Sequence, residues 1–270
     1  MGDRQIHAEK SQADMSSRAR FDLAGKVAVV TGGGQGIGRA IAEALAEHGA
    51  TVVACGRSRE TLESTAGVIR DRGGTAQALQ LDVTSDEDMA RGRDWLAREF
   101  GGVDVLVNNA GINPHYGSIE KTSLEDWNHI LAVNLTGVFR CCRELGGLMP
   151  GRRGGSIINI SSIAGHVGLK RQVPYSAAKG GVEQLTKSLA YDWAEHGVRV
   201  NAIAYGFVAT DLTAGMLRHE HIAPRLLARI PMGRFARLDE VAGAAVFLAS
   251  DASSYVTGHS LLVDGGWTAT

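Results

Sequence analysis

Short apolar runs alternate with amphipathic stretches along almost the whole chain, and this alternation restricts the fold more than any other feature of the sequence. The apolar runs are typical of buried strands, and the stretches between them have apolar residues at helical spacing. Strands that alternate with helices of this length pair in parallel, with helices on both faces of the sheet. We therefore expect an α/β fold with a doubly wound, mostly parallel, seven-stranded sheet. The expected strands are 26–31, 51–55, 76–81, 103–108, 156–161, 199–204 and 259–263, and the expected helices are 36–48, 59–72, 87–100, 124–149, 175–196 and 240–249.

Two segments stand outside this alternation. Residues 1–20 are polar and mixed in charge, without the apolar core of a signal peptide, so we expect a flexible N-terminal tail followed by a single domain over 21–270. Residues 205–238 have no clear periodicity. They follow the carboxyl end of an expected strand, where sheets of this kind bind ligands, so we expect them to form a substrate lid.

Charge and cysteine content argue against several classes of partner. The formal net charge of −1 gives no reason to expect a nucleic acid or a membrane surface as partner, and no run of about 18 apolar residues predicts a membrane span. The three cysteines have no metal-ligand spacing, and no metal site is expected. Buried free thiols in a reducing, cytoplasmic compartment are the simplest interpretation.

A glycine-rich turn lies between the first expected strand and the first expected helix. Residues 31–38 read T-G-G-G-Q-G-I-G, in a chain with 35 glycines among 270 residues. A diphosphate needs backbone N–H groups that no Cβ obstructs, together with the positive end of a helix dipole. Gly32, Gly36 and Gly38 at the start of a helix would supply both, so we expect a dinucleotide here.

The spacing of these glycines resembles the short-chain dehydrogenase/reductase family, whose loop is T-G-x3-G-x-G. Further similarities follow in order: N-N-A-G at 108–111, V-N-L around Asn134, a serine pair at 161–162, and Y-x3-K from Tyr175 to Lys179. The resemblance runs from about residue 21 to 267. It implies a Rossmann fold and a nicotinamide cofactor. It also implies a homotetramer with interfaces on the helices that begin near 124 and at 175 and on segment 263–266.

Tyr175 and Lys179 are four residues apart on one expected helix and therefore share a face. A free phenol has a pKa of about 10 and exchanges protons poorly near neutral pH. An ammonium group one helical turn away favours the phenolate, so we expect Lys179 to lower the pKa of Tyr175. Tyr175 would then act as general acid and base in hydride transfer between the nicotinamide C4 and a carbonyl or alcohol carbon.

The resemblance implies roles for further residues. Ser162, thirteen residues before Tyr175, would polarise the substrate oxygen, and Asn134 would hold a water that links Lys179 to solvent. Ser161, the neighbour of Ser162, could instead satisfy nearby backbone groups. Ser162 is therefore preferred because of its spacing from Tyr175. The residues implied in cofactor binding are Gly32, Gln35, Gly36, Ile37, Gly38, Arg57, Ser58, Asp82, Val83, Asn109, Ala110, Gly111, Tyr175, Lys179, Gly206, Val208 and Thr210.

The end of the second strand indicates which nicotinamide is used. A carboxylate at this place bonds the ribose 2′-hydroxyl, whereas a basic residue accepts a 2′-phosphate. Gly56 occupies the usual place of the acid, and Arg57 and Ser58 follow. We therefore expect NADP(H) to be preferred over NAD(H).

One position departs from the family pattern: Tyr205 stands where a proline usually precedes Gly206. Proline would stiffen this turn, and tyrosine does not. Three interpretations are open: a natural change in pocket shape, an engineered substitution, or a ring that points away from the site. The expected substrate pocket comprises His115, Tyr116, His166, Gln172, Tyr205, Phe207, Leu212 and Met216.

Aromatic and aliphatic groups in this expected pocket favour a moderately apolar ketone or secondary alcohol as substrate. A carbonyl reductase or secondary-alcohol dehydrogenase is therefore the leading hypothesis. A 3-oxoacyl-carrier-protein reductase and a sugar-acid or polyol dehydrogenase such as gluconate 5-dehydrogenase remain alternatives. A nicotinamide-binding sensor without catalysis would tend to lack part of the Asn–Ser–Tyr–Lys set, all of which is present here.

Overall fold

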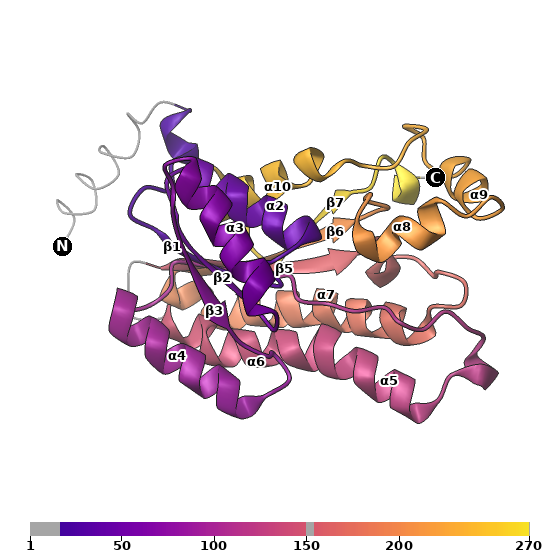
Figure 1. Ribbon diagram of the computed structural model, residues 1–270, viewed down its shortest axis with the longest axis horizontal. Helices are drawn as coiled ribbons and strands as arrows, with labels where there is room; N and C mark the ends of the chain where they lie inside the picture. Colours follow the sequence, from indigo (N-terminus) through magenta and orange to yellow (C-terminus); the bar gives the residue numbers. More distant parts are fainter. Residues whose placement is uncertain (1–16, 150–153, 270) are drawn as a thin grey trace.

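The computed structural model describes residues 17–149 and 154–269, and its centre is a seven-stranded sheet (Figure 1). All neighbouring strands pair in parallel, in the order β3-β2-β1-β4-β5-β6-β7. The expected α/β class and doubly wound sheet are confirmed, and the sheet is parallel throughout. The strands are β1 Val27–Thr31, β2 Thr51–Gly56, β3 Thr75–Gln80, β4 Val105–Asn108, β5 Gly155–Ser162, β6 Val198–Tyr205 and β7 Ser260–Val263.

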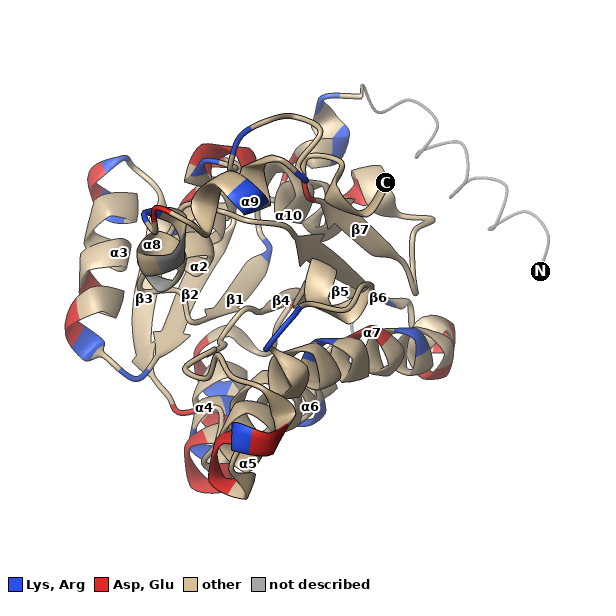
Figure 2. Cartoon of the chain, turned by 90° about the vertical axis from the view of Figure 1, so that its right-hand side faces the viewer, with Lys and Arg blue, Asp and Glu red and all other residues tan. Residues whose placement is uncertain are grey.

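Helices cover both faces of this sheet (Figure 2). Side chains alternate along each strand, so Val30 packs with helices α2, α3 and α10 on one face, while Val29 packs with α4, α6 and α7 on the other. The helices are α2 Gly36–Glu47, α3 Arg59–Asp71, α4 Asp86–Phe100, α5 Leu124–Leu131, α6 Gly137–Glu144, α7 Val173–Trp193, α8 Asp211–Leu217, α9 Ala223–Leu227 and α10 Ala242–Ala249. Within the described ranges, no helix is both long and apolar enough to cross a membrane.

The helix expected over 124–149 is interrupted. Helix α5 passes into a π-helical turn, Ala132–Thr136, before α6 begins, and a 3-10 turn, Gly146–Leu148, follows α6. Asn134 lies in the π turn and is fully buried. π-helical turns are rare, but those that occur are often found at functional sites, because the extra residue redirects a side chain.

Residues 205–238, expected to form a lid, contain the two short helices α8 and α9. The two ends of this segment are joined by a parallel bridge between Val208 and Ala236, and the amide of Ala209 donates to the Ala236 carbonyl at 2.9 Å. Both ends of residues 205–238 are therefore fixed beside the end of β6. The flexible tail expected over 1–20 falls mostly outside the described residues; Ala19–Phe21 form a 3-10 turn.

Candidate active site

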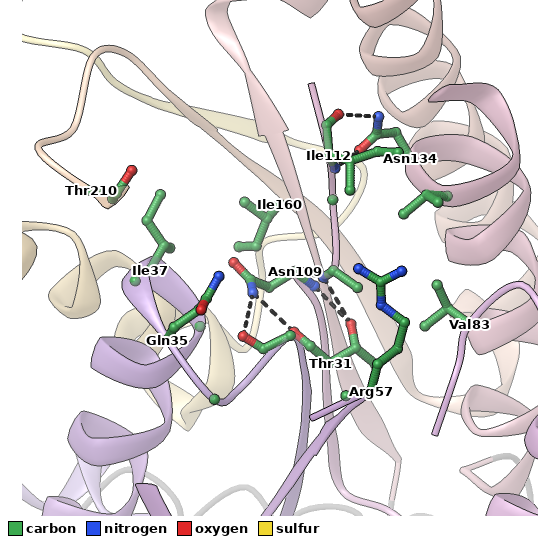
Figure 3. A pocket seen from close by; sticks show the side chains of 18 of the residues that line it. Thr31, Gln35, Ile37, Arg57, Val83, Asn109, Ile112, Asn134, Ile160 and Thr210 are labelled. Atoms are coloured by element: carbon green, nitrogen blue, oxygen red, sulfur yellow. Dashed lines mark hydrogen bonds between the residues drawn. The ribbon is translucent and has the colours of Figure 1, made fainter. Parts of the chain in front are cut away.

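A cleft of about 590 Å³ lies at the carboxyl ends of the central strands. Every residue that the sequence predicts for cofactor binding or catalysis lines this one cleft, although the residues come from segments more than 150 positions apart. Figure 3 shows the glycine turn, the end of β2, the segment after β4 and Asn134 around it. This is the edge of an open parallel sheet where ligands are expected.

The glycine turn connects β1 to α2 at the floor of the cleft. Gly32 and Gly36 have φ angles of +65° and +54°, which residues with a Cβ rarely adopt. A Cβ on Gly38 would collide with the carbonyl of Gly32 and the side-chain amide of Asn109. The turn therefore depends on glycine at these places, and it brings the N-terminus of α2 to the cleft.

The segment after β4 holds this turn in place. The side-chain amide of Asn109 donates to the carbonyls of Thr31 and Gly32 at 2.9 and 3.2 Å. The Thr31 hydroxyl accepts the backbone amides of Asn109 and Ala110 at 3.0 and 3.1 Å (Figure 3). Thr31 was not predicted as a site residue, although it begins the T-G-G-G run.

The end of β2 places Arg57, with its exposed side chain, in the cleft wall (Figure 3). Gln80, at the end of β3, donates to the backbone carbonyl of Arg57 at 2.9 Å and fixes this strand end. The hydroxyl of Ser58 caps α3 by accepting the amide of Thr61. The carboxylate of Asp82 accepts the amide and hydroxyl of Thr84, both at 2.8 Å.

The side chain of Asn134 hydrogen-bonds to the backbone of a single residue, Ile112. Its side-chain oxygen accepts the amide of Ile112 at 2.9 Å, and its side-chain nitrogen donates to the carbonyl of Ile112 at 2.7 Å (Figure 3). Both polar ends of the side chain are thereby engaged with the segment that follows N-N-A-G. Asn134 fixes the π turn against this wall of the cleft.

Tyr175 and Lys179 lie on α7 and face the same cleft, with the Lys179 Nζ 5.6 Å from the centroid of the Tyr175 ring. The ammonium of Lys179 donates to the carbonyl of Ile160 at 2.7 Å. Burial lowers the pKa of Lys179 to about 8, and the negative charge of Glu183 opposes this shift. Ile160, whose carbonyl holds the lysine, carries no signal of this role in the sequence.

The expected lowering of the Tyr175 pKa is wrong for this structure. Burial raises the pKa of Tyr175, and a side-chain hydrogen bond with Ser162 opposes the rise. The reason is that desolvation of the phenolate outweighs the attraction of an ammonium beside the ring and engaged with Ile160. Burial therefore favours the phenol, which is the form that donates a proton.

The two serines after β5 differ in their bonding. The Ser162 hydroxyl accepts the amide of Ala164 at 3.1 Å and bonds with Tyr175, whereas the buried Ser161 hydroxyl has no hydrogen-bond partner among the residues that the structure describes. The bond to Tyr175 supports Ser162 as the residue that acts with it on a substrate oxygen.

Tyr205 contributes to the cleft wall, but its side chain lies in the core between the sheet and α10. It is 3% exposed, and its hydroxyl donates to the carbonyl of Val241 at 2.6 Å. These contacts support the interpretation in which the ring points away from the site.

A Tyr205→Phe substitution is expected to lower the free energy of unfolding by about 1–3 kcal/mol, because the buried carbonyl of Val241 loses its hydroxyl donor. Urea denaturation measures this loss, and Tyr255→Phe is the control, since Tyr255 is fully exposed. Unchanged stability with altered substrate selectivity would contradict this account.

Five of the other residues expected at the substrate pocket are described by the structure and do not line this cleft, and each of the five has partners elsewhere. His115 bonds to Thr122 at 2.9 Å, and the ring of Tyr116 lies under Arg171. The remaining three are also engaged: Gln172 accepts from Asn113 at 2.9 Å, His166 contacts Glu183 and Ser260, and Phe207 packs edge-on against Trp267 at 4.9 Å. The side chains of Leu212 and Met216 lie outside the described part of the structure.

Comparison with known proteins indicates the family of this chain. A family profile described as enoyl-(acyl carrier protein) reductase matches residues 32–268. The cis-4-hydroxycyclohexanecarboxylate dehydrogenase of Sinomonas cyclohexanicum is 44% identical over 247 residues, which are 92% of this chain and 98% of that protein. The gluconate 5-dehydrogenase of Gluconobacter oxydans (strain 621H) is 38% identical over 256 residues, 95% and 100% of the two chains.

A solved structure is similar to this chain in both sequence and fold. The gluconate 5-dehydrogenase from Burkholderia cenocepacia J2315, in complex with NADP and tartrate, superposes with a TM-score of 0.91 at 37% identity over 94% of this chain and all of that chain. The chain therefore belongs to the short-chain dehydrogenase/reductase family, oxidoreductases that act on CH–OH groups with NAD(P).

Proposed function

We propose that this protein is an NADP(H)-dependent carbonyl reductase and secondary-alcohol dehydrogenase in which Tyr175 is the general acid and base. The observation that supports this most strongly is that Tyr175, Lys179 and Ser162 line the same cleft as the glycine turn. A carbonyl carbon beside a bound nicotinamide would then lie within reach of both the phenol and the serine hydroxyl.

The residues present fit a dinucleotide. A Cβ on Gly36 would stand 3.8 Å from the Thr210 Cγ2, so glycine at this place keeps the space between α2 and the segment after β6 open. The start of α2 and the turn before it would hold the diphosphate through backbone amides. Gly206, Val208 and Thr210 line the opposite wall, where the nicotinamide would be held. When bound, the nicotinamide supplies or accepts the hydride.

Side chains of this protein donate and accept the proton of the reaction. In the reduction direction Tyr175, kept as a phenol by burial, donates its proton to the substrate oxygen, while Ser162 hydrogen-bonds to the same oxygen. Lys179 stabilises the phenolate that remains. Asn134 keeps the neighbouring wall rigid through Ile112. In the oxidation direction the phenolate accepts the proton of the alcohol.

Arg57 supports NADP(H) as the preferred cofactor. Its guanidinium is exposed in the cleft at the end of β2, next to Gly56, where an acid would otherwise contact the ribose. A guanidinium binds a phosphate by charge-assisted hydrogen bonds, whereas a carboxylate would repel it.

A sugar-acid or polyol dehydrogenase is a second candidate, because two gluconate 5-dehydrogenases are among the similar proteins. A panel of simple ketones, 5-ketogluconate and a 3-oxoacyl thioester, each with NADPH and with NADH, tests these proposals by absorbance at the nicotinamide band. We expect turnover with at least one carbonyl compound. Cofactor binding without turnover of any of them would indicate a nicotinamide sensor.

A homotetramer is supported by apolar side chains that are exposed on the expected interfaces. Leu124 on α5, Phe139 on α6 and Tyr191 on α7 are 79%, 46% and 88% exposed. Light scattering is expected to give four times the 28.5 kDa mass of one chain. A mass of one chain would contradict the proposal. The three buried free thiols support a reducing, cytoplasmic compartment.

A further inference from the structure

Helix α7 carries a third ionisable side chain on the stripe that begins with Tyr175 and Lys179. Glu183 follows Lys179 by four residues, so the three lie one helical turn apart on one face. Lys179 and Glu183 are only 4% and 6% exposed. A buried carboxylate is costly unless an opposite charge and hydrogen bonds compensate for its lost hydration. The proposed function assigns no role to Glu183.

The carboxylate of Glu183 is held from two other elements. The Ser260 hydroxyl, on β7, donates to its Oε1 at 3.1 Å, and the His166 Nε2, on the segment after β5, lies 3.1 Å from the same oxygen. Among the described residues, the charged or titratable groups that face Glu183 are therefore Lys179 from its own helix and His166 from this segment. These contacts orient the carboxylate independently of Lys179.

Gly165 keeps this region closely packed. A Cβ on Gly165 would stand 3.0 Å from the backbone of Lys179 and 3.1 Å from the Cγ of Glu183. Because both side chains are also buried, the charges of Lys179 and Glu183 interact through protein more than through solvent. Burial alone favours the neutral amine of Lys179, and the negative charge of Glu183 favours the ammonium.

Building on the proposed function, we propose that Glu183 is a positioning residue of this site: its buried carboxylate supplies the negative charge that keeps Lys179 in the ammonium form beside Tyr175. Glu183 does not line the cleft. It acts through Lys179, while Ser260 and His166 hold its carboxylate in place.

Competitive acetylation with acetic anhydride between pH 6 and pH 11, followed by mass spectrometry of each lysine peptide, tests this directly in the full chain. Only the neutral amine reacts, so the pH of half-maximal reactivity reports the pKa of each of the six lysines. In Glu183→Gln we expect the Lys179 profile to move to lower pH by about one unit. Lys121, exposed on a turn away from α7, is the internal reference and keeps its profile.

The matched control is Glu195→Gln, which removes an exposed carboxylate that also contacts a histidine, His196 at 3.8 Å. It should leave the Lys179 profile unchanged. Glu183→Asp keeps the charge and should restore most of the wild-type profile. If Glu183→Gln does not fold, Glu183→Met, which fills a similar volume without charge, is expected to give the same shift. An unchanged Lys179 profile in a folded, uncharged variant would overturn the proposal.

A second readout separates charge from mere structure. For Glu183→Gln we expect the loss in kcat/KM for ketone reduction to grow from pH 7 to pH 9, as Lys179 loses its proton earlier than in the wild type. A purely structural role would lower activity by the same factor at every pH. The acetylation needs no turnover, so a wild-type protein that reduces no carbonyl compound overturns the proposed function and leaves the assignment of Glu183 to be decided by acetylation.

Discussion

Replacing Tyr175 with phenylalanine is expected to lower kcat for carbonyl reduction by about 10² to 10⁴-fold, the usual contribution of a positioned general acid. The phenol hydrogen-bonds with Ser162 in the cleft and is the proton donor of the proposed mechanism, and phenylalanine keeps the ring but removes the proton. The substituted site therefore retains its shape. Steady-state kinetics measure turnover, and NADPH fluorescence measures the dissociation constant of NADPH. We expect turnover to fall while the dissociation constant changes little.

Tyr255→Phe is the matched control for this substitution. Tyr255 lies outside the cleft and the expected interfaces and is fully exposed, so removal of its hydroxyl should leave kcat within a factor of two. Turnover of Tyr175→Phe within a few-fold of the wild type would contradict the proposed mechanism. Weakened NADPH binding in parallel with turnover would assign Tyr175 to cofactor binding instead.

The architecture and the cleft were largely predictable because their signals are local. Each strand is an apolar run that ends in a turn, and the turns after parallel strands meet at one edge of the sheet, which brings residues 31–38, 108–111 and 162 together. The Y-x3-K spacing likewise places Tyr175 and Lys179 on one face of α7. Neither inference needs knowledge of distant packing.

Side-chain partners across the fold were not predictable in the same way. The ring of Tyr205 could turn to either side of β6, and a core space beside α10, with the carbonyl of Val241 as hydrogen-bond acceptor, decides its orientation. His166 is drawn to Glu183 and Ser260, from elements 17 and 94 residues away. The direction of the Tyr175 pKa shift also depends on burial, which spacing on a helix does not report.

The interruption of the helix expected over 124–149 has a similar cause. Its apolar spacing is compatible with a continuous helix, but the buried amide of Asn134 bonds both backbone groups of Ile112. That contact stabilises one extra residue in the turn, Ala132–Thr136. A partner on another segment, rather than local propensity, therefore determines the break.

Replacing Arg57 with aspartate is expected to reverse the cofactor preference. The guanidinium is exposed in the cleft at the end of β2. Its loss would remove the charge-assisted hydrogen bonds that we propose it makes to a 2′-phosphate, which corresponds to about a 100-fold fall in kcat/KM for NADPH. The new carboxylate would repel the phosphate and accept the 2′-hydroxyl of NADH, so kcat/KM for NADH should rise or stay constant. Initial rates with each cofactor at a fixed ketone concentration measure the ratio.

Arg59→Asp is the matched control, because Arg59 is also exposed and lies two residues further on, in the first turn of α3. An aspartate is favourable at that end of a helix, so the fold should tolerate it. A general effect of negative charge near the cleft would weaken NADPH in both variants, whereas a specific contact with the 2′-phosphate would weaken it only in Arg57→Asp. Equal kcat/KM values for NADPH and NADH in the wild type would contradict the assignment of Arg57, because a phosphate held by a guanidinium must distinguish the two cofactors.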